Sequence, residues 1–272
     1  MKGTFFKLAN ADFTGQGLPS LSTIVASSQA RYAFDFRNGN LVDVTGKTAD
    51  LVPYRVDNTL NTRVVDSSVV QQAFNGLGIK LSGGCLMTSV DFSTIKIDGS
   101  TPISILVVGG WSGDAASPQI RIASFLDIGN GVSANAQGAV MQFYNNGGGQ
   151  IGARVKSGGD SNVGDIVSPT NKLCFMILTF NGTTWTLVNK TTGKTTIKTN
   201  IELGITADIL PVPNNAANKV GSKHYLGHAH TITPLDALPV NLCQVAYWDK
   251  VLSPAEIDAQ YAMSKGMFGD LI

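Results

Sequence analysis

The chain has 272 residues and a formal net charge of +1; 14% of its residues are charged and 43% are hydrophobic. Its 20 Lys and Arg residues are spread along the sequence, so no basic patch indicates a nucleic-acid partner. No apolar run approaches the length of a membrane span, and we expect no membrane insertion. The 30 glycines and the low charge favour a compact β protein over a helical or disordered one.

Two further features bear on the compartment. Cys85, Cys174 and Cys243 are odd in number and lie in or beside apolar runs, which favours buried free thiols over a disulfide framework. The first residues also lack the apolar core of a signal peptide. We therefore expect synthesis in a cytoplasm and no secretion through a leader.

Residues 1–30 are predicted to form an N-terminal arm, ahead of a single domain at residues 31–272. The arm contains turn formers and isolated apolar residues without a sustained period. Such a segment can pack along its own domain or dock on another chain.

From Arg31 onward the sequence alternates between short strand patterns and turn signals. Residues 103–111 and 173–180 are apolar on both faces, which predicts central strands in a covered sheet. Asn181-Gly182 is the clearest hairpin turn. Residues 50–75 and 204–222 are predicted to be loops. The expected strands are 31–36, 78–83, 103–111, 120–128, 140–144, 151–155, 173–180, 184–188, 195–199, 223–232 and 240–248, and residues 41–46 are expected to form a short strand or a turn.

A single helix is predicted after the last strand. Ser253 is a natural N-cap, Pro254 suits the first helical position, and Glu256 stands three residues after the cap. Ile257 and Tyr261 would hold this helix against a sheet. Ten to twelve short strands with one terminal helix predict an antiparallel sandwich of two sheets.

Three blocks of the chain together resemble the LamG-type, concanavalin A-like lectin/glucanase domain. The closing block is the most specific, because such domains end with a strand, an aromatic-rich turn and a capped helix. The resemblance covers roughly residues 31–265 and implies an all-β jelly-roll sandwich of two antiparallel sheets with a short C-terminal helix. The blocks are Tyr32–Phe36 with Leu41–Gly46, Phe175–Val188, and Tyr225–Gly227 with Cys243–Ile257.

The stretch Leu8–Pro19 resembles the openings of bacteriophage virion proteins. This resemblance implies a tail or decoration protein that is made in the bacterial host cytoplasm and located in the virion. We expect the arm to contact other virion proteins and the protein to form a homo-oligomer.

Glucanases of this fold carry a Glu-x-Asp-x-x-Glu strand, and retaining hydrolysis needs two carboxyl groups about 5–5.5 Å apart. The only Glu-x-Asp here is Glu256-Ile-Asp258, which lies in the predicted helix with Tyr261 in place of the third carboxylate. Glu202 is the one other glutamate of the chain. We therefore predict a protein that is not an enzyme, with a glycoside hydrolase as the least favoured alternative.

Carbohydrate binding calls for an exposed aromatic ring beside amide and carboxylate side chains. Trp111 with Asp114, and Tyr144 with Asn145 and Asn146, have that composition and are the candidate glycan-binding residues. The alternative is that both rings belong to the core.

All three histidines, His224, His228 and His230, share parity in one predicted strand and would point to one face. Such a set can bind zinc if a further ligand completes it, whereas the alternative is a strand end with solvated imidazoles. Calcium also occurs on this fold, but no dense Asp/Asn run resembles a ligand loop. We expect no cofactor and keep zinc and calcium as alternatives.

These observations favour a lectin-like virion module that contacts a host-surface glycan. The competing interpretation is a purely structural decoration, collar or tail-fibre module that binds only neighbouring virion chains.

Overall fold

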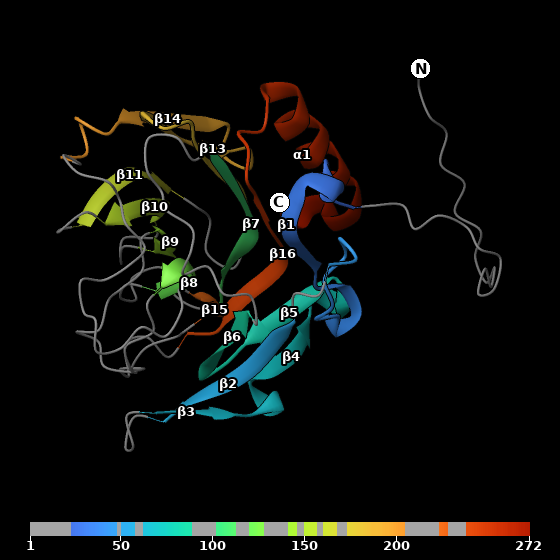
Figure 1. Ribbon diagram of the computed structural model, residues 1–272. Coiled ribbons are helices and arrows are strands. Elements are labelled where there is room, and N and C mark those ends of the chain that lie inside the picture. Colours follow the sequence, from blue (N-terminus) through green and yellow to red (C-terminus); the bar gives the residue numbers. More distant parts are fainter. Residues whose placement is uncertain are drawn as a thin grey trace.

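The structure is a computed structural model, shown in Figure 1. It describes residues 23–47, 50–57, 62–88, 102–112, 120–127, 141–145, 150–156, 160–167, 173–204, 223–227 and 238–272. Within these ranges the strands form two eight-stranded antiparallel sheets that lie face to face, so the predicted sandwich is confirmed.

The first sheet is built around the two longest apolar strands, β7 (Ile103–Trp111) and β16 (Val240–Trp248). Both are buried along their whole length, as expected for strands covered on two faces. β1 (Ala30–Asp35) pairs with the second half of β16. The other strands run outward from this centre in the order β14 (Lys194–Thr199), β13 (Thr184–Asn189), β12 (Cys174–Phe180), β7, β16, β5 (Gly78–Leu81) and β4 (Val70–Ala73).

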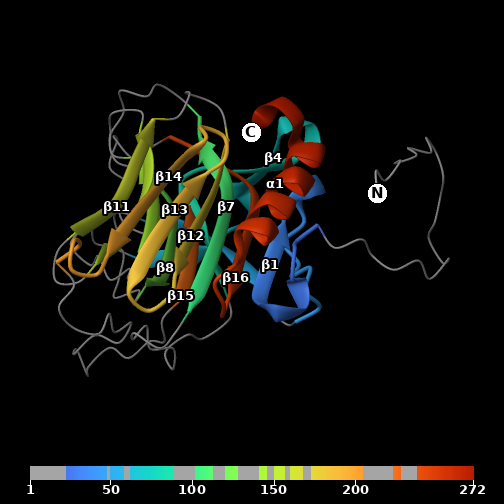
Figure 2. The same ribbon diagram turned by 90° about the horizontal axis from the view of Figure 1, so that it is seen from above.

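The second sheet lies opposite the first, as Figure 2 shows from above. Its order is β11 (Asp160–Val167), β10 (Gln150–Lys156), β9 (Met141–Asn145), β8 (Ile120–Asp127), β15 (Lys223–Gly227), β6 (Gly84–Thr88), β2 (Leu51–Asp57) and β3 (Thr62–Val65). Strands distant in sequence, such as β8 and β15, are therefore neighbours.

The main core fills the space between the sheets with the inward side chains of both. Alternation along each strand sends every second residue there. The largest fully buried rings in this layer are Tyr32, Phe34, Phe36, Trp111, Phe125, Phe143, Phe180, Trp185 and Tyr247.

β16 interrupts this alternation at one point. Its pairing with β7 shifts register between Leu242 and Gln244, which marks a β-bulge. Leu242 and Val245 both face the main core, whereas Cys243 packs on the outer face of the sheet. Gln244 also points outward, since it bonds to side chains of the C-terminal helix. The bulge thus places two consecutive side chains under that helix.

The outer face of the first sheet is covered by α1 (Pro254–Phe268), which lies beside β1 and β16 in Figure 2. Its start is the predicted capping box: Ser253 N donates to Glu256 Oε2 at 2.8 Å, and Glu256 N donates to Ser253 Oγ at 3.3 Å. Hydrogen bonding to Lys250 and to the Ser253 backbone lowers the pKa of Glu256. The Glu256 carboxylate therefore caps the N-terminus of α1, as predicted from the sequence.

Residues 23–30 belong to the sandwich in this structure. Ile24 and Ala30 are buried in the second hydrophobic cluster, against the sheet and α1. The other residues of the predicted arm, 1–22, lie outside the described ranges. The role of the arm as an anchor stays a prediction.

Most of the strands were predicted within a few residues, and four in the first third of the sandwich were not. The predicted loop at 50–75 contains β2, β3 and β4, and β6 follows it. β11 was also missed, because its sequence is largely polar. Short 3-10 turns complete the described chain at Ser27–Gln29, Arg37–Gly39, Ser67–Val69, Phe74–Gly76 and Gly269–Leu271.

Candidate functional site

The outer face of the second sheet carries polar and aromatic side chains, which alternate with the apolar residues of the core. In β9, Met141 and Phe143 point into the main core, so Gln142 and Tyr144 point outward. In β10, Arg154 lies between two core residues and also points outward.

The polar side chains of this face form a chain across three strands. Register places Gln142 beside Ser124 on one side and beside Arg154 on the other. Arg154 Nε donates to Gln142 Oε1 at 2.7 Å, and Gln142 Nε2 donates to Ser124 Oγ at 3.3 Å. All three residues are buried, so these bonds satisfy groups that would otherwise be costly to desolvate.

Two tyrosine rings on the same face lie beneath guanidinium groups. The Cζ atom of Arg154 is 4.9 Å from the ring centroid of Tyr144, and that of Arg63 is 4.8 Å from the ring of Tyr225. Tyr54 packs with Tyr225 in a small cluster. We call Tyr54, Arg63, Tyr144, Arg154 and Tyr225 the tyrosine–arginine face; it crosses the sheet from β3 to β10 (Figure 1).

Access to this face differs from one end to the other. Tyr144, Arg154 and Tyr225 are buried, whereas Tyr54 and Arg63 are partly exposed. A guanidinium group binds a carboxylate with two parallel hydrogen bonds, and a tyrosine ring packs against the apolar side of a sugar. The exposed end of the face therefore has the chemistry needed to hold an acidic carbohydrate.

Of the predicted glycan-binding residues, Tyr144 lies on this face, under Arg154, but it is only 3% exposed, so it does not present the exposed ring that was expected. Asn145 ends β9 and pairs with Ile151 of β10. Asp114 and Asn146 lie outside the described residues, and glycan contact by these loops stays a prediction.

Trp111 does not present an exposed ring. It is 1% exposed and belongs to the main core, because it shares inward parity with Ile105 and Val107 in β7. The expectation of an exposed plate at this position is therefore wrong, and the core alternative holds. Its Nε1 has no hydrogen-bond partner among the described residues.

His224 also points into the space between the sheets. Its Nδ1 is 2.5 Å from the Tyr32 hydroxyl, and its ring centroid is 5.0 Å from that of Phe125 and 5.1 Å from that of Tyr247. Burial and then the positive charge of Arg31 lower the pKa of His224 well below its usual value. The imidazole is thus a neutral core group.

The shared parity of the three histidines is not carried by a regular strand. β15 ends at Gly227, whose φ of 86° breaks the extended conformation. His228 and His230 lie outside the described residues, so zinc binding stays a prediction, as does calcium. Within the described ranges, no group of three or more His, Cys, Asp or Glu side chains is arranged to hold a metal.

Sequence reasoning missed Tyr54, Arg63, Arg154 and Tyr225. The signal available for Arg154 was a lone charge in the apolar strand Ile151–Val155, which is unusual for a buried position. Arg63 and Tyr225 had no such signal, because their contact depends on strands 160 residues apart becoming near neighbours in one sheet.

No protein-family model matches the chain, and a search of curated proteins gives no match either. Solved structures are similar in fold. The ligand-binding domain of botulinum neurotoxin serotype D in complex with N-acetylneuraminic acid has a TM-score of 0.57 at 14% identity, covering 87% of this chain and 51% of that chain.

Two other solved structures have a similar likeness. The binding domain of botulinum neurotoxin DC in complex with rat synaptotagmin II has a TM-score of 0.58 at 11% identity over 87% of this chain and 52% of that chain. Trypanosoma rangeli sialidase in complex with 2,3-difluoro-KDN has a TM-score of 0.55 at 12% identity over 89% of this chain and 33% of that chain.

At these identities the likeness shows the fold alone, which is an antiparallel β-sandwich of two sheets. The chain spans about half the length of the neurotoxin domains and a third of the sialidase. No described helix is long and apolar enough to cross a membrane.

Proposed function

We propose that the chain is a non-catalytic, LamG-type carbohydrate-binding module of a bacteriophage virion, and that it contacts a host-surface glycan through the tyrosine–arginine face. The observation that carries this proposal is that Arg63 and Tyr54, which are both partly exposed, lie beside the buried Tyr225 ring at the accessible end of the second sheet. Aromatic rings and a cation at one place match the apolar faces and the carboxylate of an acidic sugar.

The comparisons support a ligand of this kind. One protein of similar fold is in complex with N-acetylneuraminic acid, and a second is in complex with 2,3-difluoro-KDN. Both are carboxylate-bearing sugars. The virion location rests on the resemblance of residues 8–19 to the openings of virion proteins. If the chain is located in the virion, other virion chains are among its partners.

The proposal of a non-catalytic module is supported by the hydrogen bonds of the two glutamates. Glu256 closes the capping box of α1, and Glu202 Oε2 accepts from Thr199 N at 2.7 Å. Each glutamate is thus engaged in a local turn or helix start, whereas retaining hydrolysis needs two carboxyl groups paired across one cleft.

Binding of the purified protein to an array of acidic and neutral glycans tests the proposal. We expect saturable binding to glycans that end in a carboxylate-bearing sugar, and roughly tenfold weaker binding for Arg63→Ala, because a charge-assisted hydrogen bond is lost. Tyr54→Ala should weaken binding to neutral and acidic sugars alike, since it removes apolar contact.

Arg55→Ala is the matched control for Arg63→Ala. Arg55 is an exposed arginine of β2 and precedes Val56, the residue that pairs with Arg63 of β3. Its Nε is 3.2 Å from Asp66 Oδ2. It points to the opposite side of the sheet and should leave binding unchanged. Equal affinity of the wild type and Arg63→Ala for every bound glycan would refute the proposed site.

A second candidate is the purely structural virion module. It is favoured by two exposed isoleucines near the edge of the first sheet: Ile197 of β14 is 60% exposed and Ile201, in the following turn, is 89% exposed. Exposed apolar side chains of this kind occur at protein–protein contacts. An array without any bound glycan, together with capture of other virion chains that Ile197→Ser abolishes, would favour this candidate.

A further inference from the structure

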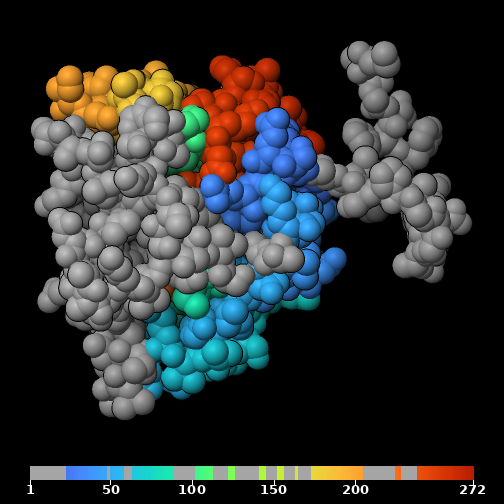
Figure 3. Space-filling view, in the orientation of Figure 1, coloured from blue at the N-terminus to red at the C-terminus, as the bar shows by residue number. Residues whose placement is uncertain are grey.

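The segment Thr23–Ala26, which we call the strap, lies against α1 and β16 where the described chain begins. Figure 3 shows the N-terminal part of the described chain in blue next to the red C-terminal helix at the surface. Three side chains bond to the strap, namely Gln244 and Trp248 of β16 and Gln260 of α1, and Ser264 of α1 bonds to both glutamines; we call these four residues the strap site.

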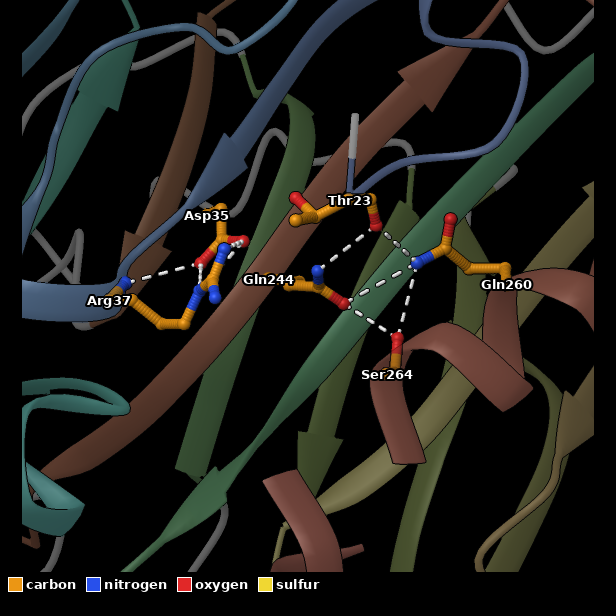
Figure 4. A network of polar contacts seen from close by, with 6 residues as sticks. All are labelled: Thr23, Asp35, Arg37, Gln244, Gln260 and Ser264. Carbon is orange, nitrogen blue, oxygen red and sulfur yellow. Dashed lines mark hydrogen bonds and ion pairs between the residues drawn. The ribbon is translucent and has the colours of Figure 1, made fainter. Parts of the chain in front are cut away.

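The strap site holds the strap through its main-chain atoms. Thr23 O accepts from Gln260 Nε2 at 3.0 Å and from Gln244 Nε2 at 3.3 Å (Figure 4). Val25 N donates to Gln260 Oε1 at 2.8 Å, and Val25 O accepts from Trp248 Nε1 at 3.2 Å. None of these contacts uses a side chain of the strap.

The strap site itself is a closed polar network. Ser264 Oγ donates to Gln244 Oε1 at 2.7 Å, and Gln260 Nε2 donates to Ser264 Oγ at 3.1 Å (Figure 4). Gln244, Gln260 and Ser264 are fully buried, although they lie on faces that otherwise pack apolar residues. A buried network of this kind is favourable only when every member is satisfied, and here the strap supplies the missing partners.

The strap has one apolar anchor and one strained joint. Ile24 is 2% exposed and packs in the second hydrophobic cluster. Ala26 has a φ of 47° and a ψ of 36°, the left-handed conformation that disfavours any residue with a Cβ. The chain therefore turns sharply, and under strain, between the strap and β1.

We propose that the strap site also receives the strap of a second copy of this chain, so that two copies exchange their straps. The contacts made in exchange are the same as those within one chain, because the strap site contacts main-chain atoms and one buried isoleucine. Opening Ala26 into an extended conformation relieves its strain, and a strained hinge beside an exchangeable segment is a recognised route to swapping.

Concentration decides between the two arrangements. Within one chain the strap is present at a high effective concentration, so the closed form dominates in dilute solution. Exchange is favoured where many copies lie close together.

Mixing two full-length preparations that carry different affinity tags tests this proposal. After incubation at high concentration and dilution, we expect mixed-tag dimers to be recovered on either resin. Ala26→Pro, which cannot adopt a positive φ, should raise the dimer fraction at least about fivefold, and Ala26→Gly, which removes the strain, should lower it by a similar factor.

A competing peptide identifies the surface involved. An excess of a synthetic peptide of residues 20–29 should block mixing, whereas the same peptide N-methylated at the Val25 amide should block it about tenfold less well, because the donor to Gln260 is lost. Gln260→Leu weakens the strap contact equally in the closed and the exchanged forms, so it should speed mixing without changing the dimer fraction at equilibrium, while Gln71→Ala, an exposed glutamine on β4, should change neither.

The outcomes are distinct. Mixing that responds to both Ala26 variants and to the peptide supports strap exchange. Folded wild-type and Ala26→Gly proteins that stay unmixed at every concentration overturn it, and so do dimers that the peptide leaves unaffected, because such dimers use another surface.

Discussion

His224 and Tyr32 form a hydrogen-bonded pair between the two sheets, with Tyr247 and Phe125 against the imidazole. Burial, and next the charges of Tyr247 and Asp43, raise the pKa of Tyr32 well above its usual value, while burial lowers the pKa of His224. Both groups are therefore uncharged over the physiological range. A proton added to the imidazole would be a charge in the centre of the core.

This pair predicts a loss of stability in mild acid. An unfolded chain protonates His224 near pH 6.5, whereas the folded chain does so only well below that, so the unfolded state binds more protons. The free energy of unfolding should be constant above about pH 6.5 and fall below it by up to about 1.4 kcal/mol per pH unit. Urea denaturation at pH 7.5 and pH 5.5 measures the difference.

The control for this prediction is His224→Gln, which keeps an acceptor for Tyr32 but cannot titrate. It should be less stable at neutral pH and should lose most of the slope between pH 6.5 and 5.5. The lowered pKa values of Asp66, Glu202 and Glu256 act in a separate window near pH 4, because these carboxylates protonate there in the unfolded chain. An unchanged slope in His224→Gln would show that other groups cause the acid sensitivity.

Among the elements, α1 shows how a local signal can be read from sequence alone. Its start depends on Ser253, Pro254 and Glu256, which are close together in the chain, and all were predicted. Its packing was predicted only in part, because the helix stripe Ile257–Gln260–Ser264–Phe268 carries two polar residues whose partners, Gln244 and the strap, are remote in sequence.

Ser253→Ala should destabilise the protein by about 1 kcal/mol, because the side chain that accepts from Glu256 N is lost. Ser253→Thr, which keeps the hydroxyl, should lie within a few tenths of a kcal/mol of the wild type. Chemical denaturation measures both. If the two variants were equally destabilised, the cap would not be the cause.

For the strands, predictability followed the kind of residue pattern. β7, β12 and β16 are continuous apolar runs and were placed within a residue or two. β2 was missed because Pro53 interrupts it and its outward residues are not consistently polar. β6 was missed because it reads as a short apolar stretch between glycines and serine. In the candidate site, only Tyr144 was predicted, since the tyrosine–arginine face joins strands that no local pattern connects.

At the scale of the whole molecule, two glycines differ in the space around them: Gly84 lies against the backbone of a neighbouring strand, whereas Gly266 faces open space. A Cβ on Gly84 would lie 2.1 Å from Tyr54 O, across the β2–β6 pair. A Cβ on Gly266, in the exposed face of α1, would meet nothing within 4 Å.

Gly84→Ala should therefore force β2 away from β6 and destabilise the sandwich by more than about 3 kcal/mol, a loss typical of a disrupted core or backbone site. Gly266→Ala should stabilise the protein by about 0.5–1 kcal/mol, because alanine favours the helix. Thermal unfolding of both variants measures the contrast. A Gly84→Ala protein as stable as the wild type would contradict the close approach of the two strands.

β16 pairs with β7 along one edge and with β1 and β5 along the other, so the centre of the first sheet is the last strand of the chain. A growing polypeptide that has made β1, β5 and β7 has three strands with no common partner until residue 248 leaves the ribosome. Folding of the first sheet must then wait for residue 248, and we expect it to be slow for the size of the domain, because its central contacts join residues far apart in the sequence. During synthesis the early strands would present unpaired edges to other nascent chains, which makes the translation rate and chaperone supply determinants of yield.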